Sequence, residues 1–220
     1  RYDIPGNVWY TNLPVGTIST TGNTLTYSGI SANLSGEYTA AQTFTAQGML
    51  YSITNGNWGT AGTWSYTAGG ASCGCTPNGH PVTISAGTTV TMATNSATAY
   101  SVTINGTLNA STTTFHNLGH VDGPGTLVLT ATTDGMFVFP GGEYDGFMNN
   151  PLSTVEFTGT NNGTLPLKPG NEYKPYQNVI FSGTGIKYMS AENLKIQGNM
   201  IIRSVTTLNN TLYNKNLTLL

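Results

Sequence analysis

Residues 82–110, VTISAGTTVTMATNSATAYSVTINGTLNA, contain two copies of one short unit. Each copy begins with Val-Thr-Ile, at residues 82–84 and 102–104, and continues through a glycine, Gly87 or Gly106, into a second short apolar segment. Alternation of apolar residues with Thr is typical of a half-buried strand, and the glycines suit tight corners. Such short strands gain a core by stacking on their own copies. The repeat therefore predicts an all-β, right-handed parallel β-solenoid.

The composition excludes several classes of protein. Only 7% of the 220 residues are charged, the formal net charge is −2, and hydrophobic residues make up 38% of the chain. Ordinary soluble domains carry about a quarter charged residues. Since basic residues do not gather in a patch, nucleic acid is not an expected partner. The apolar runs are also too short for a membrane span.

Residues 1–48 differ in pattern from the rest of the chain. Residues 24–27 alternate, and Gly36-Glu37-Tyr38 follows. The spacing resembles the E and F strands of an immunoglobulin-like sandwich, where the tyrosine, here Tyr38, ties a corner back to the backbone. We expect either the C-terminal part of such a sandwich or a β-rich segment that leads into the solenoid.

Residues 49–81 are expected to form the cap where the solenoid begins. Trp58 and Trp64 lie six residues apart among Gly and Thr. A solenoid must close the end of its core, and large aromatic rings supply the area for this. We therefore favour a capping role for both rings over a platform that stacks on sugars.

The two cysteines of the chain, Cys73 and Cys75, follow in the same segment. A zinc site would need further ligands, and His80 is the one close candidate. In an exported protein a disulfide is favoured over free thiols, and the intervening glycine makes that small ring feasible. We therefore expect a bridge that adds little stability through chain entropy.

From residue 82 to residue 220 we expect solenoid coils that continue beyond the C-terminus, because the final Leu-Thr-Leu-Leu is a strand with nothing after it. The chain also begins with Arg1 rather than Met, which suggests a piece of a longer protein. Corresponding segments recur at roughly 20 to 26 residues, and almost no helix is expected. The predicted strands are residues 82–84, 90–92, 102–104, 127–129, 136–139, 154–157, 179–181, 194–196, 200–202 and 217–219.

Two segments interrupt the period, at about 134–152 and 166–176, and protrusions of this kind often carry function. Glu143 and Asp145 would share a face of an extended chain and are candidates to hold Ca²⁺ or to act as a glycosidase pair. A solvated corner is the simpler interpretation. His116 and His120 have metal-like spacing only on a helix, so we predict no metal site from them. If the protrusions bind a glycan, its contacts are expected at Glu143, Tyr144, Asp145, Phe147 and Tyr173.

The ordered series of motifs resembles the β-solenoid regions of very large secreted surface proteins of Bacteroidota. It comprises Asn57-Trp58, Thr63-Trp64-Ser65, the Cys-x-Cys pair, and the Val-Thr-Ile units with their glycines. The coils near residues 153–157, 176–183 and 216–219 continue it. Members of this group are exported by the type IX system and include adhesins linked to gliding motility. The resemblance implies an extracellular location on the cell surface.

Two classes of function follow from these observations. The favoured one is a non-catalytic structural or adhesive module of a large surface protein, without cofactors. Its expected partners are the neighbouring domains of the same chain, surface glycans and other cell-surface proteins. The alternative is a module that binds or cleaves carbohydrate, since parallel β-helices also host polysaccharide lyases. The fold alone does not decide between them.

Overall fold

The computed structural model of the chain describes residues 2–3, 8–9, 17–21, 24–28, 48–93, 96–110, 116–166, 175–190, 193–203, 206–210 and 217–219. The chain divides into two compact units, Arg1–Ala46 and Gln47–Leu220. The described residues are rich in strands, with one five-residue α-helix, so the all-β class is confirmed.

The first unit contains two antiparallel strand pairs. Strands β1 (Tyr2–Asp3) and β2 (Val8–Trp9) form one pair, and β3 (Thr17–Thr21) and β4 (Thr24–Ser28) form a hairpin. The predicted strand at 24–27 is therefore part of β4. Tyr38 and the rest of the proposed sandwich corner lie outside the described residues.

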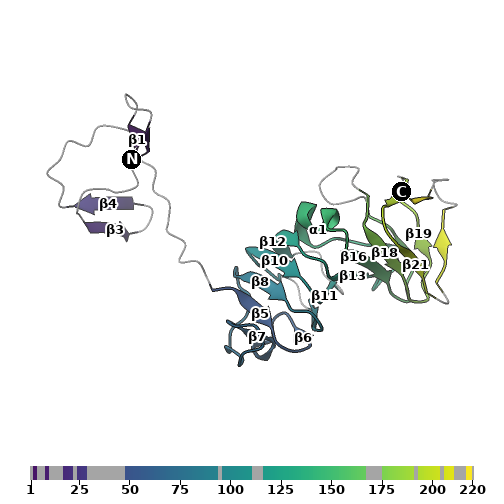
Figure 1. Ribbon diagram of the computed structural model, residues 1–220, viewed down its shortest axis with the longest axis horizontal. Coiled ribbons are helices and arrows are strands. Elements are labelled where there is room, and N and C mark those ends of the chain that lie inside the picture. Colours follow the sequence, from purple (N-terminus) through teal and green to yellow (C-terminus); the bar gives the residue numbers. More distant parts are fainter. Residues whose placement is uncertain are drawn as a thin grey trace. The chain divides into compact units, whose positions relative to one another are not determined.

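Parallel pairing dominates the second unit. In its first sheet the strands follow the order β15-β12-β10-β8-β5-β7, and every neighbouring pair is parallel except β5 with β7. Figure 1 shows β5, β8, β10 and β12 side by side in this order. The strands are β5 (Leu50–Ser52), β7 (Trp64–Ser65), β8 (Pro81–Ile84), β10 (Ser101–Ile104), β12 (Asn117–Asp122) and β15 (Gly141–Glu143).

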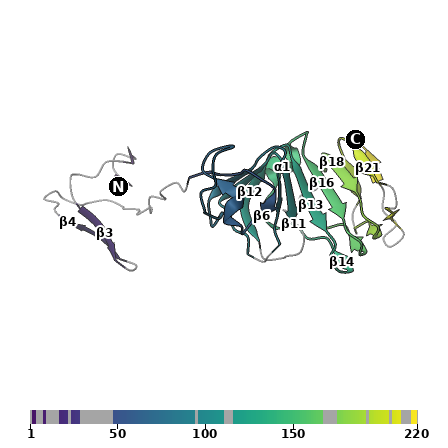
Figure 2. The ribbon, with the colours of Figure 1, turned by 90° about the horizontal axis from the view of Figure 1, so that it is seen from below.

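The second sheet is parallel throughout, in the order β21-β18-β16-β13-β11-β9-β6. Figure 2 shows β11, β13, β16, β18 and β21 as successive neighbours. Its strands are β6 (Gly56–Asn57), β9 (Thr89–Thr91), β11 (Thr107–Ala110), β13 (Thr126–Thr130), β16 (Thr154–Thr158), β18 (Asn178–Phe181) and β21 (Met200–Ile202).

A third sheet begins later in the chain, in the order β14-β17-β19-β22, and it is also parallel. Its strands are β14 (Gly135–Met136), β17 (Gly163–Thr164), β19 (Lys187–Tyr188) and β22 (Leu208–Asn209). Strands β20 (Leu194–Ile196) and β23 (Leu217–Leu219) form a separate parallel pair. We call each pass of the chain through the first, the second and, where present, the third sheet a rung.

The rungs stack in register, and this places apolar side chains in columns. One column in the second sheet runs through five buried residues, because each occupies the equivalent position of its own rung. The spacing between column partners varies from 18 residues (Val90 to Leu108) to 28 residues (Leu127 to Val155), so the loops absorb the irregularity. The column is Val90, Leu108, Leu127, Val155 and Val179.

A second column, two residues further along each strand, becomes aromatic toward the C-terminus. Ala110, Leu129, Phe157 and Phe181 occupy it in successive rungs. The Phe157 and Phe181 rings stack with centroids 5.8 Å apart, and Phe137 meets Phe157 edge to face at 5.2 Å. Since burying such a side chain contributes about 1.5–3 kcal/mol, these columns account for much of the stability of the unit.

Side-chain amides and carboxylates join the corners of consecutive rungs. The Asp134 Oδ1 atom accepts a hydrogen bond from the Asn162 backbone N–H at 2.8 Å. The Asn162 Oδ1 atom in turn accepts one from the Ile186 N–H at 2.9 Å. These bonds satisfy backbone donors that the sheets leave unpaired where the chain turns.

The residues predicted to form a cap cover one end of the first sheet. Strand β7 pairs antiparallel with β5, on the side of β5 that faces away from β8. The Trp64 side chain is fully buried and its Nε1–H donates to the Trp58 carbonyl at 2.9 Å. The two indoles meet edge to face with centroids 5.4 Å apart, and Trp58 is also buried. A short 3-10 turn, η1 (Ala61–Thr63), links these parts.

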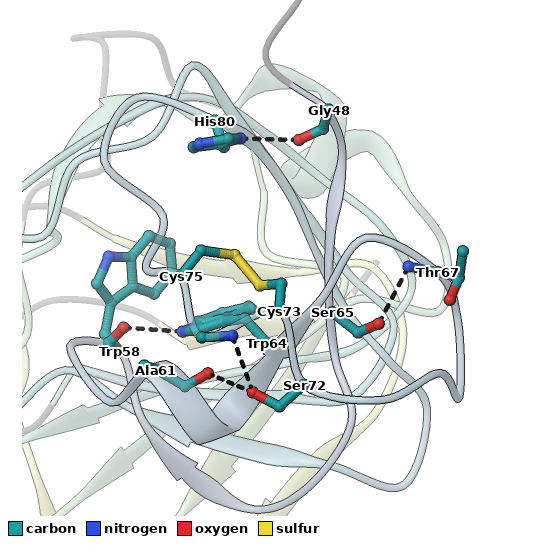
Figure 3. The surroundings of a disulfide bond; sticks show 11 residues. Gly48, Trp58, Ala61, Trp64, Ser65, Thr67, Ser72, Cys73, Cys75 and His80 are labelled. Atoms are coloured by element: carbon teal, nitrogen blue, oxygen red, sulfur yellow. Dashed lines mark hydrogen bonds between the residues drawn. A yellow bond between two sulfur atoms is a disulfide. The ribbon is translucent and has the colours of Figure 1, made fainter.

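The predicted Cys73–Cys75 bridge is confirmed, and it lies beside the Trp64 ring (Figure 3). Both cysteines are partly buried against the core. The Cys73 N–H donates to the Trp64 carbonyl at 2.9 Å, and the Ser72 hydroxyl donates to the Ala61 carbonyl at 2.9 Å. The bridged segment is thus attached to the tryptophan that closes the core.

Replacement of Trp64 by alanine should therefore remove the main part of the cap. We expect a loss of about 3–5 kcal/mol in the free energy of unfolding, because a fully buried indole leaves a large cavity. Urea unfolding is the measurement. Tyr66→Ala, two residues away and exposed, is the control and should stay within about 0.5 kcal/mol of the unchanged protein. Equal effects of the two changes would contradict the capping role.

Lys187 is a buried cation inside the stack. Its side chain is fully buried, and the Nζ atom donates to the Gly185 carbonyl at 2.6 Å and to the Gly159 carbonyl at 3.3 Å. Burial lowers the pKa of Lys187 below its ordinary value, because desolvation penalises the ammonium form. Below the pKa that Lys187 has in the folded protein, its side chain is protonated in both the folded and the unfolded chain. Between that value and 10.5 the unfolded chain holds more protons, so stability rises with pH.

Lys187→Met should abolish that contribution. We subtract the unfolding free energy of Lys187→Met from that of the unchanged protein. This difference should increase as the pH rises from about 7 to 10, because only the unchanged protein gains stability from Lys187. Urea unfolding across this range measures it, and the tyrosines common to both proteins cancel in the difference. Lys195→Met, at an outer position of β20, is the control. A pH-independent difference would contradict the assignment.

Most predicted strands are present within a residue or two of their expected bounds. The segment at 136–139 is different, since β14 contains only Gly135–Met136. The segment at 134–152 is also less of a protrusion than expected. Both β14 and β15 belong to the parallel ladders, and only the corner between β15 and β16 departs from them, in helix α1 (Asp145–Asn149).

Candidate functional site

Two of the predicted glycan contacts point into the protein. Tyr144 and Phe147 are buried, and the Tyr144 hydroxyl donates to the Pro140 carbonyl at 2.9 Å. Burial raises the pKa of Tyr144 well above its ordinary value. Helix α1 explains why these side chains are buried. Tyr144, Phe147 and Met148 have the spacing that places side chains on one face of a helix, and this face packs into the protein. The prediction that Tyr144 and Phe147 contact a ligand from a protruding corner is therefore wrong.

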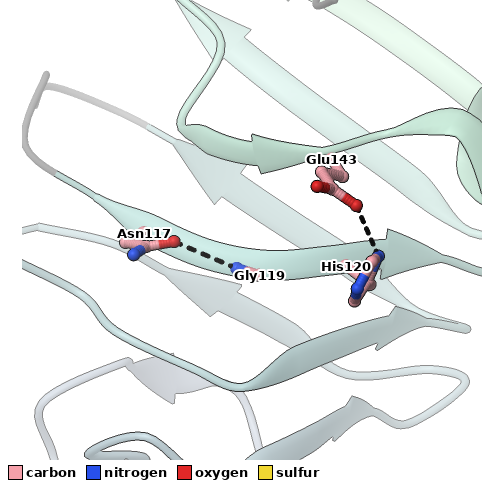
Figure 4. A network of polar contacts seen from close by, with 4 residues as sticks. All are labelled: Asn117, Gly119, His120 and Glu143. Atoms are coloured by element: carbon pink, nitrogen blue, oxygen red, sulfur yellow. Dashed lines mark hydrogen bonds and ion pairs between the residues drawn. The ribbon is translucent and has the colours of Figure 1, made fainter.

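Glu143 lies at the surface, where the analysis of the sequence placed it, but its partner was not anticipated. It ends β15, the edge strand of the first sheet, and the register sets it directly opposite His120 of β12. The Glu143 Oε2 atom lies 2.8 Å from His120 Nδ1, and both side chains are 73% exposed (Figure 4). Solvent therefore screens this contact strongly.

A local irregularity in β12 presents His120 outward. The register with β15 shifts between Asn117 and His120, and Gly119 between them has a φ of +58°. The Asn117 Oδ1 atom accepts a hydrogen bond from the Gly119 N–H at 3.3 Å, as Figure 4 shows. Only glycine adopts this conformation without strain, and a Cβ at position 119 would collide with the Tyr100 carbonyl. Bulges of this kind often re-aim a side chain.

Two further carboxylates lie near α1. Asp122, the last residue of β12, accepts a hydrogen bond from the Gly123 N–H at 2.6 Å, and its carboxylate lies against Gly146 of the helix. Asp145 is exposed at the first position of α1. Within the described residues no group of three or more His, Cys, Asp or Glu side chains is placed to hold a metal ion. Tyr173, the remaining predicted contact, lies outside the described residues.

His116 and His120 have different environments and do not form a pair. His116 is buried, and its Nδ1 atom accepts a hydrogen bond from the Ala97 N–H at 3.1 Å. Desolvation lowers the pKa of His116 below its ordinary value, which keeps the imidazole neutral near pH 7. His116 thus joins neighbouring rungs, while His120 faces outward.

A group of aromatic side chains beside the ends of β7, β8 and β10 was not identified from the sequence. Tyr66 and Tyr100 are exposed, the Tyr66 ring lies near the His80 ring, and the Tyr100 N–H donates to the His80 carbonyl. The signal that would have identified them is the coil period. His80 and Tyr100 each stand one residue before equivalent strands, and the equivalent position in the next rung is Gly119, inside β12.

Comparison with known proteins supplies no additional assignment: neither the family models, nor the curated proteins, nor the solved structures include a match to this chain. In the part of the chain that the structure describes, no helix has the length and apolar character to cross a membrane.

The exposure of His120 and Glu143 predicts weak coupling between them. A double-mutant cycle with His120→Gln, Glu143→Gln and the double variant should give about 0.2–1 kcal/mol at low salt and a pH near 6. The coupling should fall further in about 1 M salt, where charges are screened within a few ångströms. A salt-insensitive coupling of several kcal/mol would instead indicate a desolvated pair in a shielded site.

Proposed function

We propose that residues 47–220 form a right-handed parallel β-solenoid that acts as a non-catalytic structural or adhesive module of a large extracellular surface protein. The observation that carries this proposal is the in-register parallel stacking of the rungs. Apart from β7, which pairs antiparallel with β5, the strands of the three sheets pair with equivalent strands of neighbouring rungs rather than with their neighbours in sequence. Parallel strands joined by crossovers are right-handed in about 98% of cases, which supports the proposed hand.

The distribution of charge also supports a structural role. Inner positions of the strands are apolar, and outer positions carry mainly Thr, Ser and Asn. A surface with few charges does not steer a charged substrate, and it suits an elongated spacer between other domains of the same chain. Neighbouring domains and molecules of the cell surface are therefore the proposed partners.

The disulfide supports an extracellular location. Disulfides persist in oxidising compartments and are rare in the cytosol. The Cys73–Cys75 bridge lies beside Trp64 at the covered end of the stack, where it contributes to a structural element. Export through the type IX system remains part of the proposal, on the resemblance of the motif series alone.

The alternative of carbohydrate cleavage depends on His120, Glu143 and Asp145. Enzymatic acids and bases work in environments that shift their pKa values, by burial or by close charges. His120 and Glu143 are largely exposed and paired with each other. This geometry favours a solvated surface contact, so carbohydrate cleavage is the less favoured function. Carbohydrate binding without turnover is compatible with the adhesive role.

A screen for turnover tests the non-catalytic role. The purified full chain, incubated with plant, algal and bacterial polysaccharides with and without Ca²⁺, should release no reducing ends or unsaturated products. The comparison set contains Glu143→Gln, Asp145→Asn and the control Glu156→Gln. Glu156 lies on the second sheet, and its carboxylate accepts a hydrogen bond from the Ser182 hydroxyl. Turnover that Glu143→Gln or Asp145→Asn abolishes and Glu156→Gln retains would contradict the proposal.

A further inference from the structure

The Tyr66 and His80 rings are neighbours beside the first sheet, and Tyr100 occupies the position equivalent to His80 one rung later; we call these three residues the aromatic edge. The Tyr66 and His80 rings have centroids 6.3 Å apart with an angle of 50° between their planes. His80 Nδ1 lies 2.8 Å from the Gly48 carbonyl oxygen, which fixes the ring. The Tyr100 N–H donates to the His80 carbonyl at 3.1 Å, so the two residues are neighbours across adjacent rungs.

The tyrosines of the aromatic edge are exposed, unlike the aromatic residues that build the core. Tyr66 is 53% exposed and Tyr100 is 65% exposed. By contrast, Trp58, Trp64 and Tyr144 are buried. Core closure therefore explains the tryptophans and Tyr144 but gives no reason for two large rings at the surface. An exposed tyrosine offers an apolar face together with a hydroxyl, which suits a ligand that is itself part apolar and part polar.

The spacing of the aromatic edge follows from the sheet. Pro81 of β8 and Ser101 of β10 are register partners, so His80 and Tyr100, which immediately precede them, lie at the N-terminal ends of neighbouring strands. Neighbouring strands are about 4.8 Å apart, a distance similar to the length of one pyranose ring in a polysaccharide. A glycan chain that crosses the strands can thus place one ring on each rung. The same row of strands leads to the exposed His120–Glu143 pair.

The charge of this region indicates the kind of glycan. Strands β5, β8 and β10, which the chain would cross, contain no Asp, Glu, Lys or Arg. Thr83, Ser101 and Thr103 contribute hydroxyl groups that hydrogen-bond without charge. On the next two strands, β12 and β15, His120 and Glu143 are paired with each other. A polyanionic polysaccharide would find no cationic side chain on these strands to pair with. A neutral polysaccharide does not need such a side chain for binding.

We propose that the aromatic edge, together with the hydroxyl-bearing outer positions of β8 and β10, binds a neutral polysaccharide chain by stacking of its pyranose rings on Tyr66 and Tyr100. The proposal deepens the adhesive role proposed above and rests on it, because it names the ligand class of that module. It also moves the glycan contacts away from Tyr144 and Phe147, which are buried.

Affinity electrophoresis of the full chain tests the proposal. The native gels contain galactomannan, xyloglucan, mixed-linkage β-glucan or, as the acidic probe, alginate. At least one neutral polysaccharide should retard the unchanged protein more than alginate does. Tyr66→Ala and Tyr100→Ala should each weaken binding about threefold to tenfold, which corresponds to about 0.7–1.4 kcal/mol, and the double variant more. Tyr188→Ala, at a partly exposed position on the third sheet, is the control and should bind normally.

A second measurement uses only the unchanged protein, so it does not depend on how the variants fold. Tetranitromethane nitrates accessible tyrosines, and mass spectrometry locates the modified residues. An oligosaccharide of the polysaccharide that binds should protect Tyr66 and Tyr100 and leave Tyr188 unprotected. Thermal unfolding of each variant shows whether a loss of retardation comes with a loss of structure, in which case the nitration result decides.

The possible outcomes separate this inference from the proposed function. Three outcomes would overturn the inference and leave the non-catalytic structural role intact. They are no retardation by any neutral polysaccharide, a preference for alginate, and normal binding by the Tyr66→Ala/Tyr100→Ala variant. Turnover of the polysaccharide contradicts the non-catalytic role, and a loss of retardation in the double variant would still support binding at the aromatic edge.

Discussion

The structure of the second unit depends on one constraint: equivalent residues of successive rungs must lie in register. Each strand pairs with a strand that lies about one rung away in sequence. A shift of the pairing register by one residue would therefore turn apolar side chains outward in every later rung. The column from Val90 to Val179 satisfies the constraint by repeating an apolar residue at each equivalent position. Rungs of unequal length are tolerated because the loops take up the difference.

The same constraint explains how much of the fold was predictable. Strands with alternating Val, Ile or Leu and Thr, such as those around Val82 and Val102, were found because their pattern has a period of two. Strand β12 was missed because its Gly119 and His120 break that pattern at the bulge. The two-residue strands of the third sheet are too short to have a pattern, and they exist only because a neighbouring rung pairs with them.

The functional surface was harder to predict, for a related reason. Glu143 was identified as exposed, but local sequence does not show that His120, 23 residues earlier, is its partner; only the register of β12 with β15 does. Tyr144 and Phe147 were predicted at the surface because helix α1 is only five residues long. So short a segment does not show a clear helical period in the sequence. The cap was predictable because the end of a stacked core must be covered, and the Cys73–Cys75 bridge because the two cysteines of the chain are separated by a single glycine.

The central claim, that equivalent residues of successive rungs are in contact, is tested most directly by nuclear Overhauser effects between methyl groups in the labelled full chain. Leu108 lies between Val90 and Leu127 in the second sheet, so its methyl groups should show cross-peaks to both. Leu127 should in turn show a cross-peak to Val155. A pattern confined to residues close in sequence, as antiparallel hairpins produce, would contradict the account.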